Sequence, residues 1–198
     1  MSPAPIENIL IVDDEPGMVD LLEVWLPEDY EAVTASTAEA ALEKFSSSID
    51  AVLLDRGLVS MDGTDLASEI RDRTADIPIA YISAKRPDID ALETGFDDYL
   101  TKPIDEQDLL STLEYFEVLY QLDGSQRRYV KTLRQQAVIY NTTNEIPRGR
   151  IDELQSTIET CQSEIDDFPN ELKELNTIGI AEPSPNSALL NTIAEPNP

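Results

Sequence analysis

Short apolar runs recur through the first 120 residues of the chain, and polar or charged residues follow them at once. The three uninterrupted runs cover residues 9–12, 51–54 and 79–82, and they end at Asp13, Asp55 and Ser83. Continuous apolar runs of this length are typical of strands that are buried on both faces of a parallel sheet. The stretches between them show the helical spacing of apolar residues, so the pattern predicts alternating strands and helices.

The remaining elements follow the same alternation. Further strands are expected over residues 30–35 and 98–101, and helices are expected after Pro16, over 38–45, around 66–70, over 88–94 and over 109–116. Five strand–helix pairs indicate an α/β fold with a doubly wound, five-stranded parallel sheet over residues 6–120, after a leader of residues 1–5. Sheets of this kind bind ligands beyond the carboxyl ends of their strands.

Five polar side chains are expected at that edge of the sheet: Asp13, Asp14, Asp55, Ser83 and Lys102. Three carboxylates at close range cannot all stay ionised without a cation, and an all-oxygen ligand set suits Mg²⁺. A lysine adds a fixed positive charge and a serine adds a hydrogen-bond donor, which are parts of a phosphoryl-transfer site. One of the carboxylates can act as the nucleophile and form an aspartyl phosphate.

Four segments carry a resemblance to a known family: Ile-Leu-Ile-Val-Asp-Asp-Glu (9–15), Leu-Leu-Asp-Arg (53–56), Ser83-Ala84 and Asp-Asp-Tyr-Leu-Thr-Lys-Pro (97–103). With these segments in this order and spacing, residues 6–120 resemble the CheY-like receiver domain of two-component response regulators, whose fold is flavodoxin-like. The resemblance implies a phosphoprotein that receives a phosphoryl group from a sensor histidine kinase. It also implies that the protein is no enzyme beyond catalysing its own phosphorylation and dephosphorylation.

The resemblance assigns roles to the residues that match the family's motifs. Asp55 would be the phosphoacceptor, and Mg²⁺ would be held by Asp13, Asp14, Asp55 and the backbone carbonyl of Gly57. Lys102 would pair with the phosphoryl group, and its peptide bond to the following proline would be cis.

Two further residues would form a switch in the resembled family, and simpler interpretations stay open beside it. Ser83 would hydrogen-bond the phosphoryl group, and Tyr99 would follow it inward. Ser83 could instead cap the helix that follows it, and Tyr99 could be a static packed aromatic residue. Asp13 and Asp14 could likewise be N-cap residues for the helix that begins near Pro16.

The spacing between Ser83 and Lys102 departs from the family's pattern. It is 19 positions, about three fewer than is usual in the resembled family. We therefore expect the fourth helix, over residues 88–94, to be roughly one turn short. That helix contributes to the common dimer face of such domains, so the usual dimer geometry does not carry over.

Residues 121–198 lack strand signals. We expect a linker over 121–125, a helical hairpin over 126–178 and a disordered tail over 179–198, where four prolines occur. The second arm has a heptad seam formed by Ile151, Leu154, Ile158, Cys161, Ile165, Phe168, Leu172 and Leu175. The hairpin resembles the HalX output domain of haloarchaeal regulators, and we expect it to form a homodimer or to bind a protein partner.

One face of the first predicted hairpin helix is basic. Arg127, Lys131 and Arg134 share this face, Arg128 lies beside it, and residues 124–144 contain no acidic side chain. The face could contact DNA phosphates, as in a transcription regulator, or pair with acidic residues of the hairpin itself. A module that controls a phosphorelay or a kinase by binding only proteins is a third interpretation.

The overall charge limits the classes of partner. With 40 acidic and 14 basic side chains, the net charge of −26 argues against a binder of nucleic acid or of anionic membranes. The absence of histidine excludes catalytic triads and His-ligated metals. No apolar run is long enough to span a membrane and no signal peptide is visible, so we expect a cytoplasmic protein. Because the acidic residues are scattered singly, we hypothesise a halophilic, archaeal source.

Overall fold

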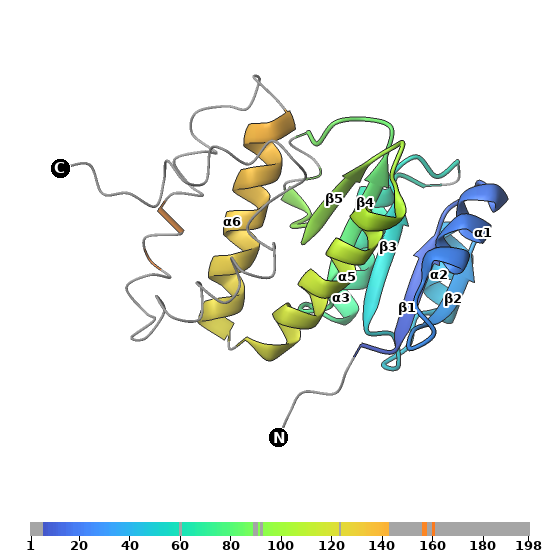
Figure 1. The fold of residues 1–198 in the computed structure, drawn as a ribbon, viewed down its shortest axis with the longest axis horizontal. Coiled ribbons are helices and arrows are strands. Elements are labelled where there is room, and N and C mark those ends of the chain that lie inside the picture. The colour runs from blue at the N-terminus through green and yellow to red at the C-terminus, as the bar shows by residue number, and fades with distance from the viewer. Residues whose placement is uncertain are drawn as a thin grey trace. The chain divides into compact units, whose positions relative to one another are not determined.

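A computed structural model describes residues 6–59, 61–88, 91, 93–122, 124–142, 156–157 and 160 of the chain. The chain divides into two compact units, Met1–Tyr120 and Gln121–Pro198. The first unit is an α/β structure, and the described part of the second unit is helical (Figure 1).

A parallel sheet of five strands forms the centre of the first unit. Its strands are β1 (Asn8–Val12), β2 (Glu31–Ala35), β3 (Ala51–Asp55), β4 (Ile79–Ser83) and β5 (Asp98–Thr101). They are ordered β2-β1-β3-β4-β5, and every neighbouring pair is parallel. The predicted doubly wound sheet is therefore confirmed, with β3 at its centre.

Helices connect the strands and begin at the residues that favour helix starts. They are α1 (Pro16–Trp25), α2 (Ala38–Lys44), α3 (Gly63–Arg73) and α5 (Glu106–Gln121). The N-cap side chains of Thr37 and Asp62 accept backbone N–H groups in the first turns of α2 and α3. α5 crosses one face of the sheet, and α3 lies on the other face (Figure 1). Of the helix expected over 88–94, Ala91 and Glu93 are described as helical.

The strands and the inner faces of the helices form the core. Residues 9–12 of β1 and all residues of β3 and β4 are buried, as continuous apolar runs predict. The first residue of α3, Gly63, packs against the end of β3. A Cβ atom there would lie 2.6 Å from the carbonyl oxygen of Asp55 and 2.7 Å from the Cα of Arg56. Only glycine allows the helix to begin this close to the strand.

In the second unit, α6 spans Gly124–Thr142 and includes the whole basic face. α5 continues to Gln121 and α6 begins at Gly124, so both helices extend into the range 121–125 that was expected to be a linker. Residues 156, 157 and 160 are helical, and all eight residues of the predicted heptad seam and the predicted tail lie outside the described residues. Within the described part of the chain, no helix combines the length and hydropathy that crossing a membrane requires.

Candidate functional site

The strand register brings the sequence-predicted side chains to one edge of the sheet. Val12 of β1 is paired with Leu54 of β3, so the residues that follow them in the chain, Asp13 and Asp55, lie level. On the other side of β3, Asp55 is paired with Ile82. Parallel pairing thus places the carboxyl ends of the central strands together, as the sequence predicted.

Three carboxylates form a cluster at this edge. Asp13, Asp14 and Asp55 each offer a carboxylate oxygen, and these oxygens all lie within 4.8 Å of one another. Asp13 is 1% exposed and Asp55 is 5% exposed, whereas Asp14 is half-buried. Two acidic side chains this deeply buried require a cationic partner, because burial disfavours their charged form.

Lys102, at the end of β5, supplies that positive charge. Its Nζ atom lies 3.0 Å from Asp13 Oδ2, 3.4 Å from Asp55 Oδ1 and 3.4 Å from Glu15 Oε1. The Lys102–Pro103 peptide bond is cis, in agreement with the resemblance. The lysine, separated by 89 positions from Asp13, therefore completes the cluster from the other end of the first unit's sequence.

The surroundings raise the pKa values of both Asp55 and Lys102 above their ordinary values. Burial, followed by the charge of Asp13, raises the pKa of Asp55, and the partial compensation comes from Lys102 and the backbone N–H of Gly57. Burial works against the charge of Lys102, but its bond to Asp13 and the charges of Asp13, Asp55 and Glu15 outweigh it and raise the lysine's pKa. The pKa of Asp55 is thus raised first by burial and then by Asp13, and Lys102 offsets only part of these two effects.

The helix-cap interpretation of Asp13 and Asp14 is wrong. Glu15 occupies the N-cap position of α1 and makes no side-chain cap bond. Asp13 Oδ1 instead accepts the backbone N–H of Glu15 at 2.8 Å, which leaves its other oxygen for Lys102. This bond fixes the orientation of the Asp13 carboxylate toward the cluster.

Gly57 lies against the carboxylate of Asp55. Its backbone N–H bonds the Asp55 side chain, and a Cβ atom at this position would lie 3.3 Å from Asp55 Oδ2. The absence of a side chain keeps that side of the carboxylate open to small ligands. The use of the Gly57 carbonyl as a metal ligand remains a prediction.

Ser83 and Tyr99 are both buried, and the backbone of Lys85 connects them. The Lys85 N–H donates to Ser83 Oγ at 3.1 Å, and the Tyr99 hydroxyl donates to the Lys85 carbonyl at 2.7 Å. Tyr99 is 7% exposed and its ring packs edge-on against those of Tyr81 and Phe96. The two predicted switch residues therefore belong to one hydrogen-bonded segment.

Sequence reasoning missed Arg56, the residue immediately after Asp55. Its side chain is buried and contacts Tyr99 and Asp88. The signal available in the sequence was an arginine directly behind a strand buried on both faces, where a charge needs a specific partner. The basic residues Arg127, Arg128, Lys131 and Arg134, by contrast, belong to α6 in the second unit.

Known proteins show the same pattern. The family model described as response regulator receiver domain matches residues 9–114. A Haloferax volcanii protein, whose assigned name is that of a proposed transcriptional regulator, is 33% identical over 159 residues, 79% of this chain and 27% of the relative. The response regulator SaeR of Staphylococcus epidermidis is 36% identical over 107 residues, 52% of this chain and 47% of SaeR.

The fold comparison agrees with the family model. A crystal structure of a CheY-like response regulator receiver domain protein from Methanospirillum hungatei has a TM-score of 0.55 and 27% identity, over 58% of this chain and 96% of that one. The chain spans about a quarter to a half of the length of the curated relatives it matches. Through its first unit, the chain belongs to the response regulator receiver domain family of two-component systems.

Proposed function

We propose that the chain is a response regulator that accepts a phosphoryl group on Asp55 from a sensor histidine kinase and signals through its C-terminal helical region. The observation that carries the proposal is the carboxylate cluster with Lys102 Nζ 3.4 Å from Asp55 Oδ1. In the transfer, a phosphorus–oxygen bond to Asp55 forms as the phosphorus–nitrogen bond of the donor breaks. The electron pair of the broken bond stays with the donor's nitrogen. A carboxylate oxygen of Asp55 is the nucleophile that forms the new bond.

The donor set of the cluster fits Mg²⁺. Its three side chains offer only oxygen atoms, which are the ligands that Mg²⁺ prefers, and Asp14 remains half-buried and accessible to water. Asp13, Asp14, Asp55 and the Gly57 carbonyl would hold the ion. When bound, Mg²⁺ would neutralise charge on the phosphoryl oxygens and on the crowded carboxylates.

The other residues of the edge would bind the phosphoryl group. Lys102 is shared among three carboxylates, and it would turn toward the new negative charge on Asp55. Ser83 Oγ accepts the N–H of Lys85, which leaves its own hydroxyl hydrogen to donate to a phosphoryl oxygen. These contacts supply the positioning and charge stabilisation on which phosphoryl transfer depends, so the chain would catalyse its own phosphorylation.

Labelling by a small phosphodonor tests the acceptor. We expect acetyl phosphate with Mg²⁺ to add one phosphoryl group to the wild-type protein, and Asp55→Asn to abolish the addition, because the amide cannot act as the nucleophile. Intact-protein mass spectrometry measures the addition. Asp72→Asn is the matched control, since it removes an exposed acidic side chain on α3.

Three results would contradict parts of this proposal. One is labelling of Asp55→Asn at full stoichiometry, which would place the acceptor elsewhere. Another is unchanged labelling of the wild-type protein in excess EDTA, which would show that phosphorylation requires no divalent ion. Loss of labelling in Asp72→Asn would show that acidic charge in general, rather than Asp55, is required.

A second candidate function concerns the output. The Haloferax volcanii relative is named for transcriptional regulation, and its similarity extends over 159 residues, beyond the receiver domain. The basic residues of α6 would then contact DNA phosphates, whereas a HalX-type hairpin that dimerises or binds a protein needs no such contact. In a gel-shift titration, DNA contact predicts binding that weakens as the salt concentration rises.

A further inference from the structure

Arg56 is a buried charge in a place where packing alone does not require one. It is 7% exposed and follows Asp55 directly. A guanidinium withdrawn from water is unfavourable unless other groups bond its N–H donors. The groups that bond this one come from two other parts of the receiver, so the side chain connects elements that the backbone does not.

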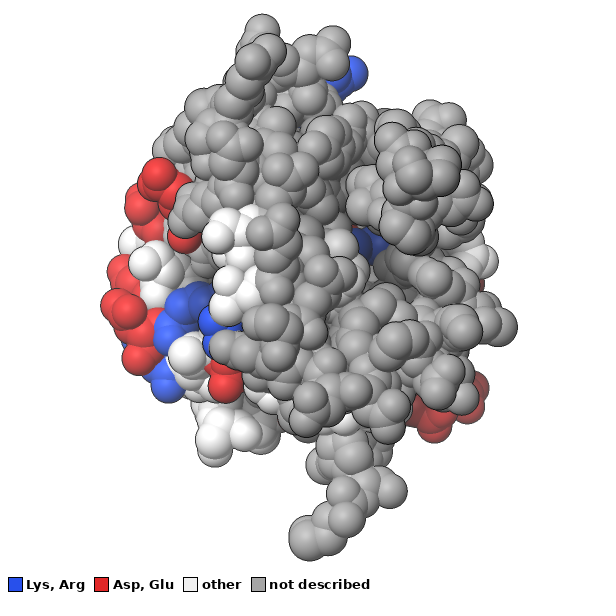
Figure 2. All heavy atoms as spheres, turned by 90° about the vertical axis from the view of Figure 1, so that its left-hand side faces the viewer, with Lys and Arg blue, Asp and Glu red and all other residues white. Residues whose placement is uncertain are grey.

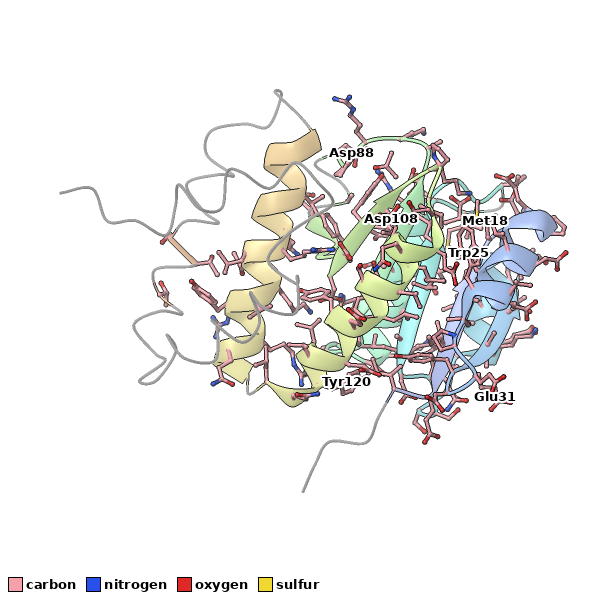
Figure 3. All side chains as sticks on the ribbon, in the orientation of Figure 1. Met18, Trp25, Glu31, Asp88, Asp108 and Tyr120 are labelled. Carbon is pink, nitrogen blue, oxygen red and sulfur yellow. The ribbon has the colours of Figure 1, made fainter. Side chains whose placement is uncertain are left out.

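The guanidinium contacts residues that precede α5 in the sequence. Nη2 lies 3.0 Å from the carboxylate of Asp88, and Nη1 donates to the Tyr99 hydroxyl at 3.4 Å. Its central carbon lies 5.8 Å from the ring centroid of Tyr81, within the range of a cation–π contact. Asp88 lies beyond the carboxyl ends of the strands, at the opposite edge from Glu31 (Figure 3), and it also accepts the N–H of Ala91.

The backbone of Arg56 is fixed on both sides. Its N–H donates to the carbonyl of Ile82 at 3.1 Å, and its carbonyl accepts the N–H of Gly63 at 3.2 Å. The arginine is therefore a rigid attachment point beside the acceptor. If Tyr99 or Asp88 moves, the backbone of Arg56 therefore stays in position.

A chain of contacts runs from this attachment point back to the cluster. Tyr99 accepts the Arg56 N–H and donates to the Lys85 carbonyl, and the Lys85 N–H donates to Ser83 Oγ. Lys102 connects Ser83 to Asp55, because its backbone N–H donates to the carbonyl of Ser83 at 2.8 Å and its Nζ contacts Asp55. Without Arg56, the buried hydroxyl of Tyr99 would keep one bond of the two.

We propose that Arg56 is a positioning residue that holds Tyr99 buried before any phosphoryl group is bound and so regulates how readily Asp55 retains one. The inference rests on the proposed function, since it concerns regulation of the same site. The buried position of Tyr99 keeps the Ser83–Lys85 segment in place beside Asp55. Arg56 gives that arrangement its advantage over one in which Tyr99 turns toward solvent.

A shift in population follows from this arrangement. When a ligand binds only one of two conformations, its apparent affinity is its intrinsic affinity multiplied by the fraction of molecules in that conformation. If Tyr99 is already buried in the free protein, a phosphoryl mimic meets a site in its binding conformation. Removal of the guanidinium lowers that fraction and weakens binding of the mimic.

The test combines a spectroscopic and a binding measurement on the full chain. Arg56→Met keeps an apolar stem and removes the guanidinium. With 3-fluorotyrosine incorporated, the ¹⁹F signal of Tyr99 is assigned by its loss in Tyr99→Phe, and a soluble paramagnetic agent reports its exposure. Beryllofluoride with Mg²⁺ is then titrated as the phosphoryl mimic.

We expect Tyr99 of the wild-type protein to be shielded with and without beryllofluoride. In Arg56→Met it should be exposed in the free protein and shielded once beryllofluoride binds, and the apparent affinity for beryllofluoride should fall by about fivefold or more. Arg86→Met, which removes an exposed arginine nearby, should behave as wild type. Arg56→Lys, with one charged donor group, should show a Tyr99 exposure and a beryllofluoride affinity between those of wild type and Arg56→Met. If Arg56→Met does not melt cooperatively, the comparison of Arg56→Lys with wild type is the test.

Three results would overturn the proposal in different ways. Shielded Tyr99 together with wild-type affinity in both Arg56 variants would show that the arginine only packs. Failure of the wild-type protein to bind beryllofluoride would instead overturn the proposed function, and the regulatory inference with it. An equal loss of affinity in Arg86→Met would attribute the effect to positive charge in general.

Discussion

At the scale of single residues, Asp55 combines a reactive position with an unfavourable environment. It is almost fully buried, it faces Asp13, and the lysine that offsets both charges is shared with Glu15. Enzymes and signalling proteins keep such repulsion where a ligand relieves it. The raised pKa of Asp55 therefore also affects the free energy of unfolding.

The pH dependence of that contribution has a definite sign. Because the pKa of Asp55 is higher in the folded than in the unfolded protein, the folded state binds the proton more tightly, and stability falls as pH rises between the two values. Above the folded value the loss is complete. We therefore expect Asp55→Asn to raise the melting temperature at pH 7 in EDTA, by roughly 2–4 °C for each kcal/mol of relief.

Calorimetry across pH tests this expectation. The gain should shrink as the pH falls through the ordinary range of aspartate, about 3.9, because the wild-type carboxyl is then neutral too. Asp72→Asn should change the melting temperature little at any pH, since that side chain is exposed. A wild-type protein more stable than Asp55→Asn at pH 7 without metal would show that Lys102 outweighs both burial and Asp13.

The predictability of these residues from sequence depends on what positions them. Asp13 and Lys102 directly follow strands and Asp55 is the last residue of one, so parallel pairing alone brings them together. The contact between Arg56 and Tyr99 depends on which side chain fills the space beneath β5, and no local pattern encodes that choice. Glu15 was missed for a similar reason, since its pairing with Lys102 is a matter of reach.

At the scale of elements, the start of α3 limits substitution more tightly than its helical sequence suggests. Alanine usually stabilises a helix relative to glycine by up to about 1 kcal/mol. At Gly63, however, the added carbon would meet backbone atoms of Asp55 and Arg56 that have little room to move. We expect Gly63→Ala to lower the free energy of unfolding by about 1–3 kcal/mol.

Gly17 provides the matched control within α1. A Cβ atom there meets nothing within 4 Å, so Gly17→Ala should leave stability unchanged or raise it by a few tenths of a kcal/mol up to about 1. Urea denaturation of the two variants measures the difference. Equal stability of Gly63→Ala and Gly17→Ala would mean that α3 shifts away from β3 without penalty.

The boundaries of the elements were predicted where sequence signals are strong. The uninterrupted apolar runs located β1, β3 and β4 to within a residue, and Pro16 marked the start of α1. Residue 121 belongs to α5 and residue 124 to α6, although the sequence of 121–125 has linker-like composition. Glycine near a helix end is compatible with either state, so composition could not decide.

At the scale of the whole molecule, acidic charge is concentrated in the receiver. Residues 1–120 contain 28 of the 40 acidic side chains and 7 of the 14 basic ones. Where Figure 2 shows described residues, acidic side chains gather along one margin with a few basic ones beside them. Such a surface repels itself unless dissolved ions screen it.

We therefore expect stability to depend on salt. The melting temperature of the full chain should rise steeply with KCl up to about 1 M, where the screening length falls to roughly 3 Å, and more slowly above it. Circular dichroism measures the transition, and sorbitol at matched osmolality controls for exclusion of solutes from the surface. No destabilisation below about 0.5 M KCl would contradict the hypothesis of a halophilic source.

The order β2-β1-β3-β4-β5 also has a consequence for how the protein is made. The central pairing joins Ile9 to Ala51, and the lysine of the site lies 89 positions after Asp13. A domain with such long-range pairings has a high contact order and folds more slowly than one built from local contacts. A nascent chain that has emerged only as far as β3 thus has the three carboxylates but not Lys102, so the charge cluster is complete only when the whole first unit has been made.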